Sequence, residues 1–469
     1  MKPNDDYVEM INTWELCEYF AEGNQKKVFE LIISNEIIPK LLGEKEDPSH
    51  YKDRINGGHI FNAVSATMCT YFGMIFRKSP TLTGDITEEM QSYIDDINGE
   101  GMSLVELAKK LVWEHIVKCR YGLLIDADKK NSDNETVAEY KSRGGRYYIK
   151  FYEAESIIDW NSTQYVCLKE DIETTVYVGL DDKDKKPFKT TCIPQWRTVD
   201  NIDGVVRVMV FRKKDKSEEY YIFDEFIAKD SNGVNLVDIP FASYPKEDIE
   251  LPVIMPLVDN GIALLIADIQ QSRLCSEIAK PTPVLAGFSE LSDNNYKNQG
   301  AINKNINLDM AIHTTDPTSK WGMLEVAGGG ASAIENRITM LKNEAAIIGS
   351  RALRESPKMV ESAETAAIHA VGESSVLGEI SKSVSNILTD TTKKLFDIAG
   401  VLHKGDFRID LNLDFMPQPM TTAEIQSYIS LVQSGYIDKE TAFNQLKTGE
   451  VIPQEIEYKD IAVANNTQV

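Results

Sequence analysis

The sequence predicts a mixed α+β fold, and three observations support this class. Residues 1–130 carry apolar residues without strand-type alternation, as helices do. Residues 146–240 hold clusters of aromatic and β-branched residues, which favour strands. Two later segments, residues 334–352 and 377–402, repeat apolar residues at steps of three and four, which is typical of long packed helices. At 469 residues the chain is long enough for roughly two to four domains.

The composition excludes several classes of protein. Asp and Glu number 73 and Lys and Arg number 50, so the formal net charge of −23 excludes a generic basic nucleic-acid binder. A hydrophobic content of 42% with 26% charged residues is that of a folded chain. The acidic start is unlike a secretory signal, and no apolar stretch approaches the ~20 residues that span a bilayer. The six cysteines include no CxxC pair, so we expect reduced thiols and no zinc knuckle.

The first part of the chain contains a clear amphipathic helix. Apolar residues in the segment Ser103–Cys119 recur at a spacing of three and four, which predicts one buried helix face. Gly122 is expected to end this helix. Residues 123–125 are apolar and predict a short buried strand that stops at Asp126.

The middle of the chain is predicted to be an antiparallel β unit. Asn232-Gly233 lies between apolar runs, which predicts a hairpin turn. Strands are expected at residues 173–180, 193–199, 205–211 and 219–226.

Two helices are then expected to flank a short excursion. Residues 257–279 have the spacing of a helix, and Pro281 and Pro283 end it because proline lacks a donor and clashes with the preceding turn. Residues 281–330 hold short apolar pieces around an Asn-rich stretch and close with three glycines, which predicts a small β or irregular excursion with a flexible hinge. The apolar seam of the second helix consists of Ile334, Ile338, Leu341, Ala345 and Ile348.

A break around Pro357 separates this helix from a longer one. If the longer helix starts near Ala363 and continues to Leu402, it has about 40 residues and a length of ~60 Å. The last elements expected are a strand at 407–413, a helix after the capping box Thr421-x-x-Glu424, and a helix at 438–447.

The sequence lacks the usual catalytic motifs, and two residue pairs are the only local candidates for metal chemistry. No GxxxxGK(S/T), GxGxxG, HExxH or GxSxG is present. Asp126 and Asp128 follow a buried strand and could hold Mg²⁺ for phosphoryl chemistry, although a solvated strand end explains them as well. His115 and Cys119 lie one helical turn apart and could bind a metal, but they fall on an apolar face where a core histidine is more usual.

Several segments match one known family in order and spacing. Residues 58–80 hold a helix that ends in a glycine, an apolar pair, Arg-Lys and proline. Residues 101–126 hold a helix that leads to a Gly-Leu-Leu-Ile-Asp strand, and residues 152–160 are Tyr-Glu-Ala-Glu-Ser-Ile-Ile-Asp-Trp. With two later blocks, at 283–287 and 361–366, these segments resemble the portal proteins of tailed bacteriophages over roughly residues 50–455.

This resemblance implies a portal fold with an α/β wing, a two-helix stem, a small β-containing clip, a long wing helix and a helical crown. The crown region is short in this chain. The implied division is 1–254 for the wing (helical 1–130, β-rich 146–240), 255–280 and 331–350 for the stem helices, 281–330 for the clip, 351–405 for the tunnel loop and long wing helix, and 406–469 for the crown and tail.

The resemblance also implies a non-enzymatic function without cofactor or metal. Portal subunits form a ring, dodecameric in the family, at one capsid vertex of the virion, after assembly in the host cytoplasm. Double-stranded DNA passes through the channel without sequence readout during packaging and ejection. The implied partners are the terminase large subunit, head–tail adaptor proteins, and the major capsid and scaffolding proteins, with no membrane. A net acidic chain suits a channel that must not hold phosphates strongly.

Two other functions remain open at this point, a different structural or adaptor protein of a virion and a Mg²⁺-dependent phosphotransferase that uses Asp126 and Asp128.

The resemblance places a tunnel loop between the heptad helices, where Arg351, Arg354 and Lys358 could touch phosphates without contacting bases. A solvated inter-helix loop is the alternative for these cations. The seam from Ile334 to Ile348 is expected to pack the stem and the oligomer.

Overall fold

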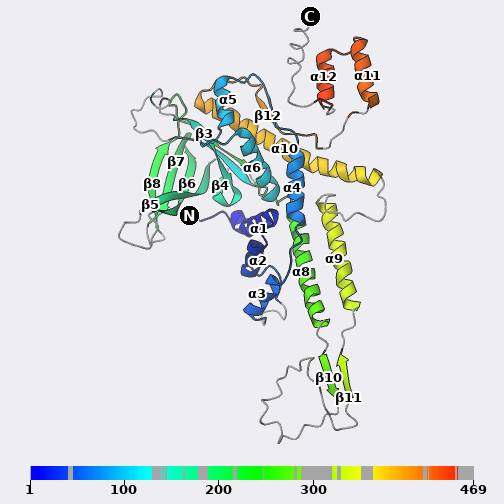
Figure 1. Ribbon diagram of the computed structural model, residues 1–469. Helices are drawn as coiled ribbons and strands as arrows, with labels where there is room; N and C mark the ends of the chain where they lie inside the picture. The colour runs from blue at the N-terminus through cyan, green and yellow to red at the C-terminus, as the bar shows by residue number, and fades with distance from the viewer. Residues whose placement is uncertain are drawn as a thin grey trace.

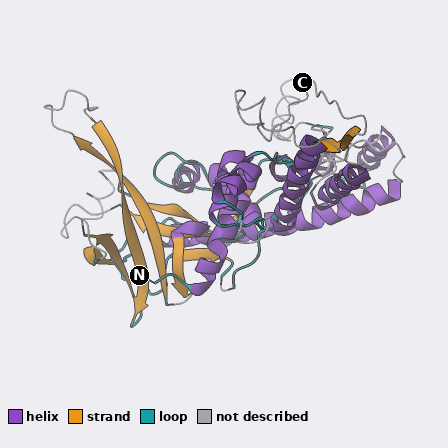
Figure 2. Ribbon diagram, turned by 90° about the horizontal axis from the view of Figure 1, so that it is seen from below, coloured by secondary structure: helices purple, strands orange, loops and turns teal. Residues whose placement is uncertain are grey.

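The computed structural model confirms a mixed α+β fold (Figure 1). It describes residues 2–40, 46–128, 139, 142, 145–161, 164–177, 188–214, 219–246, 248–278, 282–286, 320–324, 329–349, 363–415, 420, 422–448 and 451–452. Figure 2 separates a β region on one side from helices on the other. An antiparallel pair of helices projects from the body formed by these regions and leads to a two-stranded sheet (Figure 1).

Six helices build the first part of the body, and local caps explain where two of them start. The Asn4 side chain accepts a hydrogen bond from the Asp6 N–H before α1, and Ser103 and Glu106 form a capping box at α6. The predicted amphipathic helix is confirmed as α6, whose apolar face joins the main core. The six are α1 (Asp5–Glu22), α2 (Gln25–Ser34), α3 (Pro48–Asn56), α4 (Ala63–Ile75), α5 (Glu88–Asp95) and α6 (Leu104–Val117).

The strand predicted at 123–125 is the centre of a three-stranded antiparallel sheet. It extends further, as β2 (Tyr121–Ala127), and lies between β3 (Tyr147–Glu153) and β9 (Phe241–Tyr244). The expectation that Gly122 ends the preceding helix was wrong, because this glycine lies inside β2. A Cβ at Gly122 would stand 2.4 Å from the Phe241 ring, so the glycine lets β9 approach closely.

A second, five-stranded antiparallel sheet follows in the order β4-β5-β6-β7-β8. The four predicted strands are confirmed as β5 to β8, but β5 begins at Tyr165 and β6 extends over Phe188–Ile202, because the two form one long ladder. The predicted turn is also present, with a φ of 81° at Gly233. The elements are a 3-10 turn η2 (Ala154–Ser156), β4 (Ile157–Asn161), β5 (Tyr165–Tyr177), β6 (Phe188–Ile202), β7 (Val205–Lys213) and β8 (Tyr220–Ile227).

The projecting pair consists of α8 (Met255–Ile278) and α9 (Gly329–Ile348). Both predicted helices are therefore confirmed. At the end of the pair, β10 (Thr282–Ala286) and β11 (Lys320–Leu324) form a two-stranded antiparallel sheet (Figure 1). The expectation of a glycine hinge was wrong for the second and third glycines of that run, which form the first turn of α9.

The long helix is α10 (Ala363–Ala399), and it crosses the body (Figure 1). Its 37 residues give a length of ~55 Å. It is shorter than predicted, since Gly400 adopts a left-handed φ of 72° after the last turn, and Leu402, expected in the seam, is 87% exposed. Leu388 is fully buried, whereas its neighbour Ile387 is only partly so, because the core surrounds more than one face of this helix.

The remaining elements lie after α10. β12 (Arg408–Asp410) pairs with β1 (Thr81–Thr83), so the predicted strand at 407–413 is a three-residue strand. Two helices, α11 (Thr422–Gln433) and α12 (Lys439–Thr448), pack against each other at the opposite end of the molecule from β10 and β11 (Figure 1). None of the helices in the described ranges is long and apolar enough to cross a membrane.

One main hydrophobic core joins the first helices, the first half of α8 and α10. Gly58, between α3 and α4, lies directly on α8. A Cβ there would stand 2.6 Å from Leu265 Cδ1 and 2.8 Å from Ile269 Cγ1. The close approach of the α3–α4 connection to α8 therefore depends on the missing side chain.

We predict that Gly58→Ala lowers the free energy of unfolding by about 1–3 kcal/mol, because the added methyl overpacks this junction. Gly73→Ala is the matched control: it lies in α4 with nothing within 4 Å of the new Cβ, so it should be neutral or stabilise by up to ~1 kcal/mol. Urea unfolding of both variants measures the difference. Equal stability of the two variants would contradict the close approach.

Candidate functional site

The expected seam of α9 faces α8 within the same chain. Leu341 is buried against Leu264 and Ala267, with Ile338 partly buried beside them. Ala345 is also buried, Ile334 is half-buried, and Ile348 at the end of the helix is 37% exposed. This seam thus holds the projecting pair together inside one chain.

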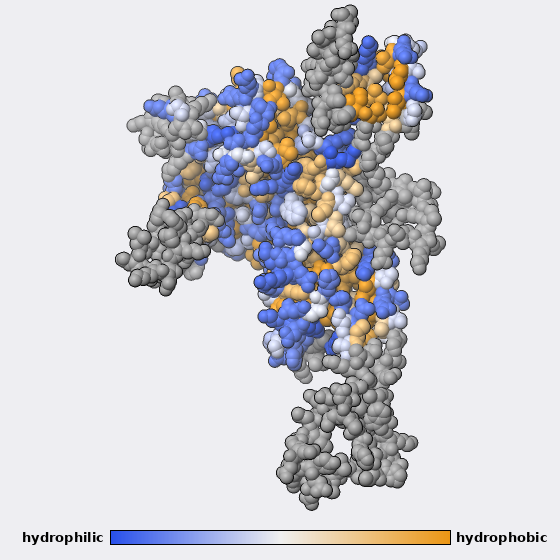
Figure 3. All heavy atoms as spheres, in the orientation of Figure 1, coloured by the Kyte–Doolittle hydropathy of each residue, from blue (hydrophilic) through white to orange (hydrophobic). Residues whose placement is uncertain are grey.

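A second apolar stripe lies on a different face of α9 from this seam. We call Ala333, Met340 and Ile347 the outer stripe; they are spaced by seven residues, or two turns, and therefore share one face. Met340 is 61% exposed and Ile347 is 59% exposed. Figure 3 shows apolar side chains at the surface along the projecting pair. Both side chains are uncovered in the single chain, so this row is a candidate for a partner surface.

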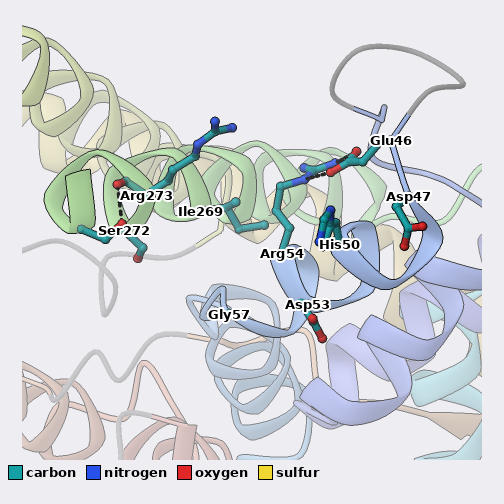
Figure 4. Close-up of a pocket in the computed structure, with 10 residues that line it drawn as sticks. Glu46, Asp47, His50, Asp53, Arg54, Gly57, Ile269, Ser272 and Arg273 are labelled. Carbon is teal, nitrogen blue, oxygen red and sulfur yellow. Dashed lines mark hydrogen bonds and ion pairs between the residues drawn. The ribbon is translucent and has the colours of Figure 1, made fainter. Parts of the chain in front are cut away.

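A hollow of about 770 Å³ lies on the other side of α8, between the α3 segment and the second half of α8 (Figure 4). We call it the α3–α8 hollow. The Arg54 guanidinium donates to both Glu46 carboxylate oxygens, at 2.9 and 2.8 Å, and this pair is mostly buried. The lining residues are Glu46, Asp47, His50, Asp53, Arg54, Gly57, Ile269, Ser272, Arg273 and Ser276.

The expected channel cations Arg351, Arg354 and Lys358 lie outside the described residues, as does most of the expected clip at 281–330. The structure does describe Gly349, the residue that follows α9. There the buried Tyr71 hydroxyl of α4 donates a 2.9 Å hydrogen bond to the Gly349 carbonyl. The segment that carries the three cations therefore starts at a point attached to the body.

Asp126 and Asp128 do not converge on a common point. The Arg197 guanidinium of β6 donates to Asp126 at 2.9 Å, and the Arg146 N–H donates to Asp128 at 3.1 Å. Within the described part of the chain, no group of three or more His, Cys, Asp and Glu residues is arranged to hold a metal ion. The carboxylate of Asp126 serves an ion pair between the two sheets.

Asp126 belongs to a larger network around the buried Glu170 of β5. Glu170 accepts hydrogen bonds from Lys150 at 2.8 Å, Tyr152 at 2.5 Å, Gln195 at 2.6 Å and Arg197 at 3.0 Å. Burial alone would raise the pKa of Glu170, but the Arg197 guanidinium and the Lys150 ammonium lower it to about 2. The carboxylate is thus held ionised and connects the two sheets.

His115 and Cys119 have separate partners. His115 is buried beside Tyr244 and 3.3 Å from the Tyr121 hydroxyl, and burial lowers its pKa to about 4. The Cys119 thiol donates to Glu250 at 3.5 Å, and burial, then the Glu250 carboxylate, raise its pKa to about 12. Both are groups of the protein interior.

Sequence reasoning missed a buried ion cluster around Lys118. This lysine is fully buried and lies 2.8 Å from Glu155, 3.2 Å from Glu18 and 3.5 Å from Glu114. Burial raises the pKa of Glu114 to about 8, although Lys118 opposes the shift. Glu114 lies in the amphipathic helix α6, and Lys118 follows this helix directly, four residues later. This spacing is the only local signal for the cluster.

We predict that Glu170→Gln lowers the free energy of unfolding at pH 7 by roughly 2–4 kcal/mol, because it removes a buried, fully bonded charge. The folded pKa lies below the ordinary value, so the contribution of Glu170 is present above about pH 4.5 and is lost as the pH falls toward 2. The variant should lose less stability over that window. Urea unfolding from pH 7 to pH 2.5 measures both effects.

Glu219→Gln is the matched control for this substitution. It breaks an exposed 2.9 Å ion pair with Lys214, which should change the stability by less than about 1 kcal/mol. Similar losses in the two variants would contradict a structural role for the Glu170 network.

Comparison with known proteins matches one domain family and several solved structures. Residues 266–395 match the family described as "Domain of unknown function (DUF4055)", from α8 to α10. No curated protein matches the sequence.

The structures found similar include three from gene transfer agent (GTA) particles. "Neck of empty GTA particle computed with C6 symmetry" has a TM-score of 0.36 and 10% identity, covering 81% of this chain and 88% of that chain. "Virion of native gene transfer agent (GTA) particle" has a TM-score of 0.36 and 9% identity, with the same coverage of 81% and 88%. "Neck of native GTA particle computed with C12 symmetry" has a TM-score of 0.34 and 11% identity, covering 82% of this chain and 90% of that chain.

Proposed function

We propose that the chain is the portal subunit of a tailed-phage-like particle. In this function, copies form a ring at one capsid vertex, and double-stranded DNA passes through the central channel during packaging and ejection. The observation that carries the proposal is the order of elements from α8 to α10. A projecting antiparallel helix pair leads to a two-stranded sheet, and a 37-residue helix then crosses the body. The portal resemblance implies the same order of stem, clip, stem and long wing helix.

A ring of copies accounts for the surface of the projecting pair. The centre of the inner seam of α9, at Leu341, is covered by α8 within the same chain. The outer stripe with Met340 and Ile347 is exposed in one chain and requires a partner. A closed ring of identical copies, twelve in the portal family, supplies one for every subunit.

DNA contact is assigned to the segment between α9 and α10. Arg351, Arg354 and Lys358 are three cations within eight positions of a chain with a net charge of −23. Repeated around a ring, they would touch phosphates in a channel without contacting bases. Exposed single contacts are weak and screened by salt, so they would restrain DNA without trapping it. The acidic remainder of the chain keeps DNA from adhering elsewhere.

The proposed partners are those that the portal resemblance implies, and they contact different parts of the ring. The segment 281–330 beyond α8 would receive the terminase large subunit during packaging and head–tail adaptor proteins afterwards. Major capsid and scaffolding proteins would surround the ring, in the host cytoplasm during assembly and at the vertex of the virion. The subunit itself would hydrolyse nothing and hold no cofactor. The carboxylates of Asp126 and Asp128 serve an ion pair and a backbone hydrogen bond instead.

We predict that the purified full-length chain forms closed rings with a central hole. Apolar side chains left uncovered in the monomer drive the assembly. Negative-stain electron microscopy shows the hole, and mass photometry gives the number of copies. Monomers at every concentration tested would overturn the proposed function.

A second prediction concerns the channel cations. Changing Arg351, Arg354 and Lys358 together to Ala should leave the rings normal but reduce the DNA retained in particles, most clearly at high ionic strength. The measurement is the DNA content of particles after a step to higher salt.

A matched control for this variant changes Lys26, Lys52 and Lys439 to Ala, because these three exposed lysines lie on α2, α3 and α12, away from the segment. Its DNA retention should equal that of the unmodified chain. Unchanged retention in the Arg351, Arg354 and Lys358 variant would show that these cations do not hold DNA.

A further inference from the structure

We propose that the junction between α1 and the β region is a proton-dependent latch, which is closed while Glu114 holds a proton and loosens when this carboxyl group ionises. The latch belongs to a single subunit and does not depend on the proposed ring. Three features of the junction point to it: the excess of negative charge around Lys118, the way in which α1 is attached, and a second buried cation without a hydrogen bond.

The cluster around Lys118 holds more negative charge than one lysine neutralises. The ammonium group has three N–H donors and one positive charge. Four carboxylates from α1, α6, β3 and η2 surround it, those of Glu155 at 2.8 Å, Glu18 at 3.2 Å, Glu114 at 3.5 Å and Glu153 at 3.9 Å. With all four ionised, four negative charges would face one positive charge, a net charge of −3. A proton on one of the carboxylates reduces this excess.

Glu114 is the carboxylate that takes this proton most readily. Its side chain is only 5% exposed, and its Oε2 atom accepts no hydrogen bond within the described part of the chain. Burial raises the pKa of Glu114 to about 8, and the neighbouring carboxylates add to this shift, whereas Lys118 opposes it. The charged and titratable groups of the junction are Lys118 after α6, Tyr7, Glu15 and Glu18 on α1, Glu153 on β3 and Glu155 on η2.

The first turn of α1 is the part of the junction that can yield. α1 contacts both α6 and η2, and its second half lies in the main core. The first turn is instead attached to the β region by individual hydrogen bonds. The Asn4 N–H donates to the Ile158 carbonyl at 3.0 Å, and the Tyr7 hydroxyl donates to the Glu155 carbonyl at 3.0 Å. β3, on the other side of the cluster, is paired along its whole length with β2 and is therefore held more firmly.

A second buried cation lies at the same junction. Arg120 is 1% exposed, and its three guanidinium nitrogens have no hydrogen-bond partner among the residues that the structure describes. Its guanidinium stands 3.6 Å from the centroid of the Trp160 ring of β4. Burial lowers the pKa of Arg120 to about 10, and Asp6 in the first turn of α1 opposes the shift. A buried charge without hydrogen bonds costs free energy, so the closed junction carries a cost that is relieved when water reaches this group.

The direction of the pH dependence follows from the proton on Glu114. In a loosened junction this carboxyl group meets water, and its pKa returns toward the ordinary value of 4.5. Because its pKa is higher in the closed junction, the closed state binds the proton more tightly, and a rising pH favours the loosened state. The contribution of this proton is fully present below about pH 4.5 and is lost as the pH rises to about 8. Within that window one proton changes the ratio of closed to loosened molecules by up to about tenfold per pH unit.

Hydrogen exchange of the full-length chain, followed by mass spectrometry, tests the latch. Protection factors are compared at pH 6 and pH 8, because they correct for the pH dependence of the intrinsic exchange rate. In the unmodified chain, the protection of residues 5–13 should fall by roughly 10- to 100-fold between these two values. β2, at the centre of its sheet, should stay more protected than α1 at both values, which separates local opening from global unfolding.

Glu114→Gln is the decisive variant, since its side chain is neutral at every pH and has the shape of a protonated glutamate. The protection of residues 5–13 should then be equal at pH 6 and pH 8, and at pH 8 it should exceed that of the unmodified chain. A side chain with a merely structural role would lose protection on substitution and never gain it. Glu9→Gln is the matched control: it removes the same charge from an exposed position on α1 outside the cluster, so the pH dependence should remain.

Four results would overturn the latch, and none of them bears on the proposed ring. They are an unmodified chain whose protection does not change with pH, a Glu114→Gln variant that keeps the pH dependence or loses protection at both values, a Glu9→Gln variant that loses the pH dependence, and a β2 that is as weakly protected as α1.

Discussion

The burial of the first half of α8 is the constraint on which the rest of the molecule depends. Leu257, Val258 and Leu265 lie in the main core with α10 and the N-terminal helices, whereas the second half of the same helix leaves the body. A continuous hydrogen-bonded helix transmits that fixed orientation along its length. The positions of α9, β10 and β11 therefore follow from side chains that are packed in the body. Gly58 shows how close this packing is, since even one methyl group does not fit there.

The charges of the chain have two distinct uses. Most carboxylates are at the surface and produce the large negative net charge, which repels nucleic acid from the outside of a proposed channel protein. A smaller set is buried with a cation, as in the pairs of Arg197 with Asp126 and Glu170. These pairs join the two sheets, so they determine how the β region is oriented on the helices. Partial removal of such a pair is costly, because it leaves an uncompensated buried charge.

α9 connects the fold of one chain to its proposed assembly. Its Leu341 row completes the helix pair, and its Met340 row remains uncovered. The first row holds the pair together in one subunit, and the second would be covered in the proposed ring. In the proposed ring, α9 would have α8 on one face and a neighbouring subunit on another, while the Tyr71 hydroxyl fixes Gly349 at its end.

The sequence by itself determined the elements whose signal is local. Apolar spacing predicts α6, α8, α9 and the start of α10 because helix geometry repeats every 3.6 residues and needs no distant partner. The strands β7 and β8 and the turn at Gly233 are predicted for the same reason, since side-chain alternation and turn chemistry act over a few residues. Only the tertiary structure decided the features that join distant residues. Arg197 meets Asp126 across 71 positions, and no local pattern in the sequence indicated this pairing.

The hollow likewise combines residues near position 50 with residues near position 270, and no spacing in the sequence relates them. Leu388 is more deeply buried than Ile387 because of the surfaces of the body that reach α10. Leu402 is exposed because α10 ends before it, at Gly400. The physical reason is that periodicity specifies which residues share a face. Only the arrangement of neighbouring elements in space specifies which of those faces is covered and by what.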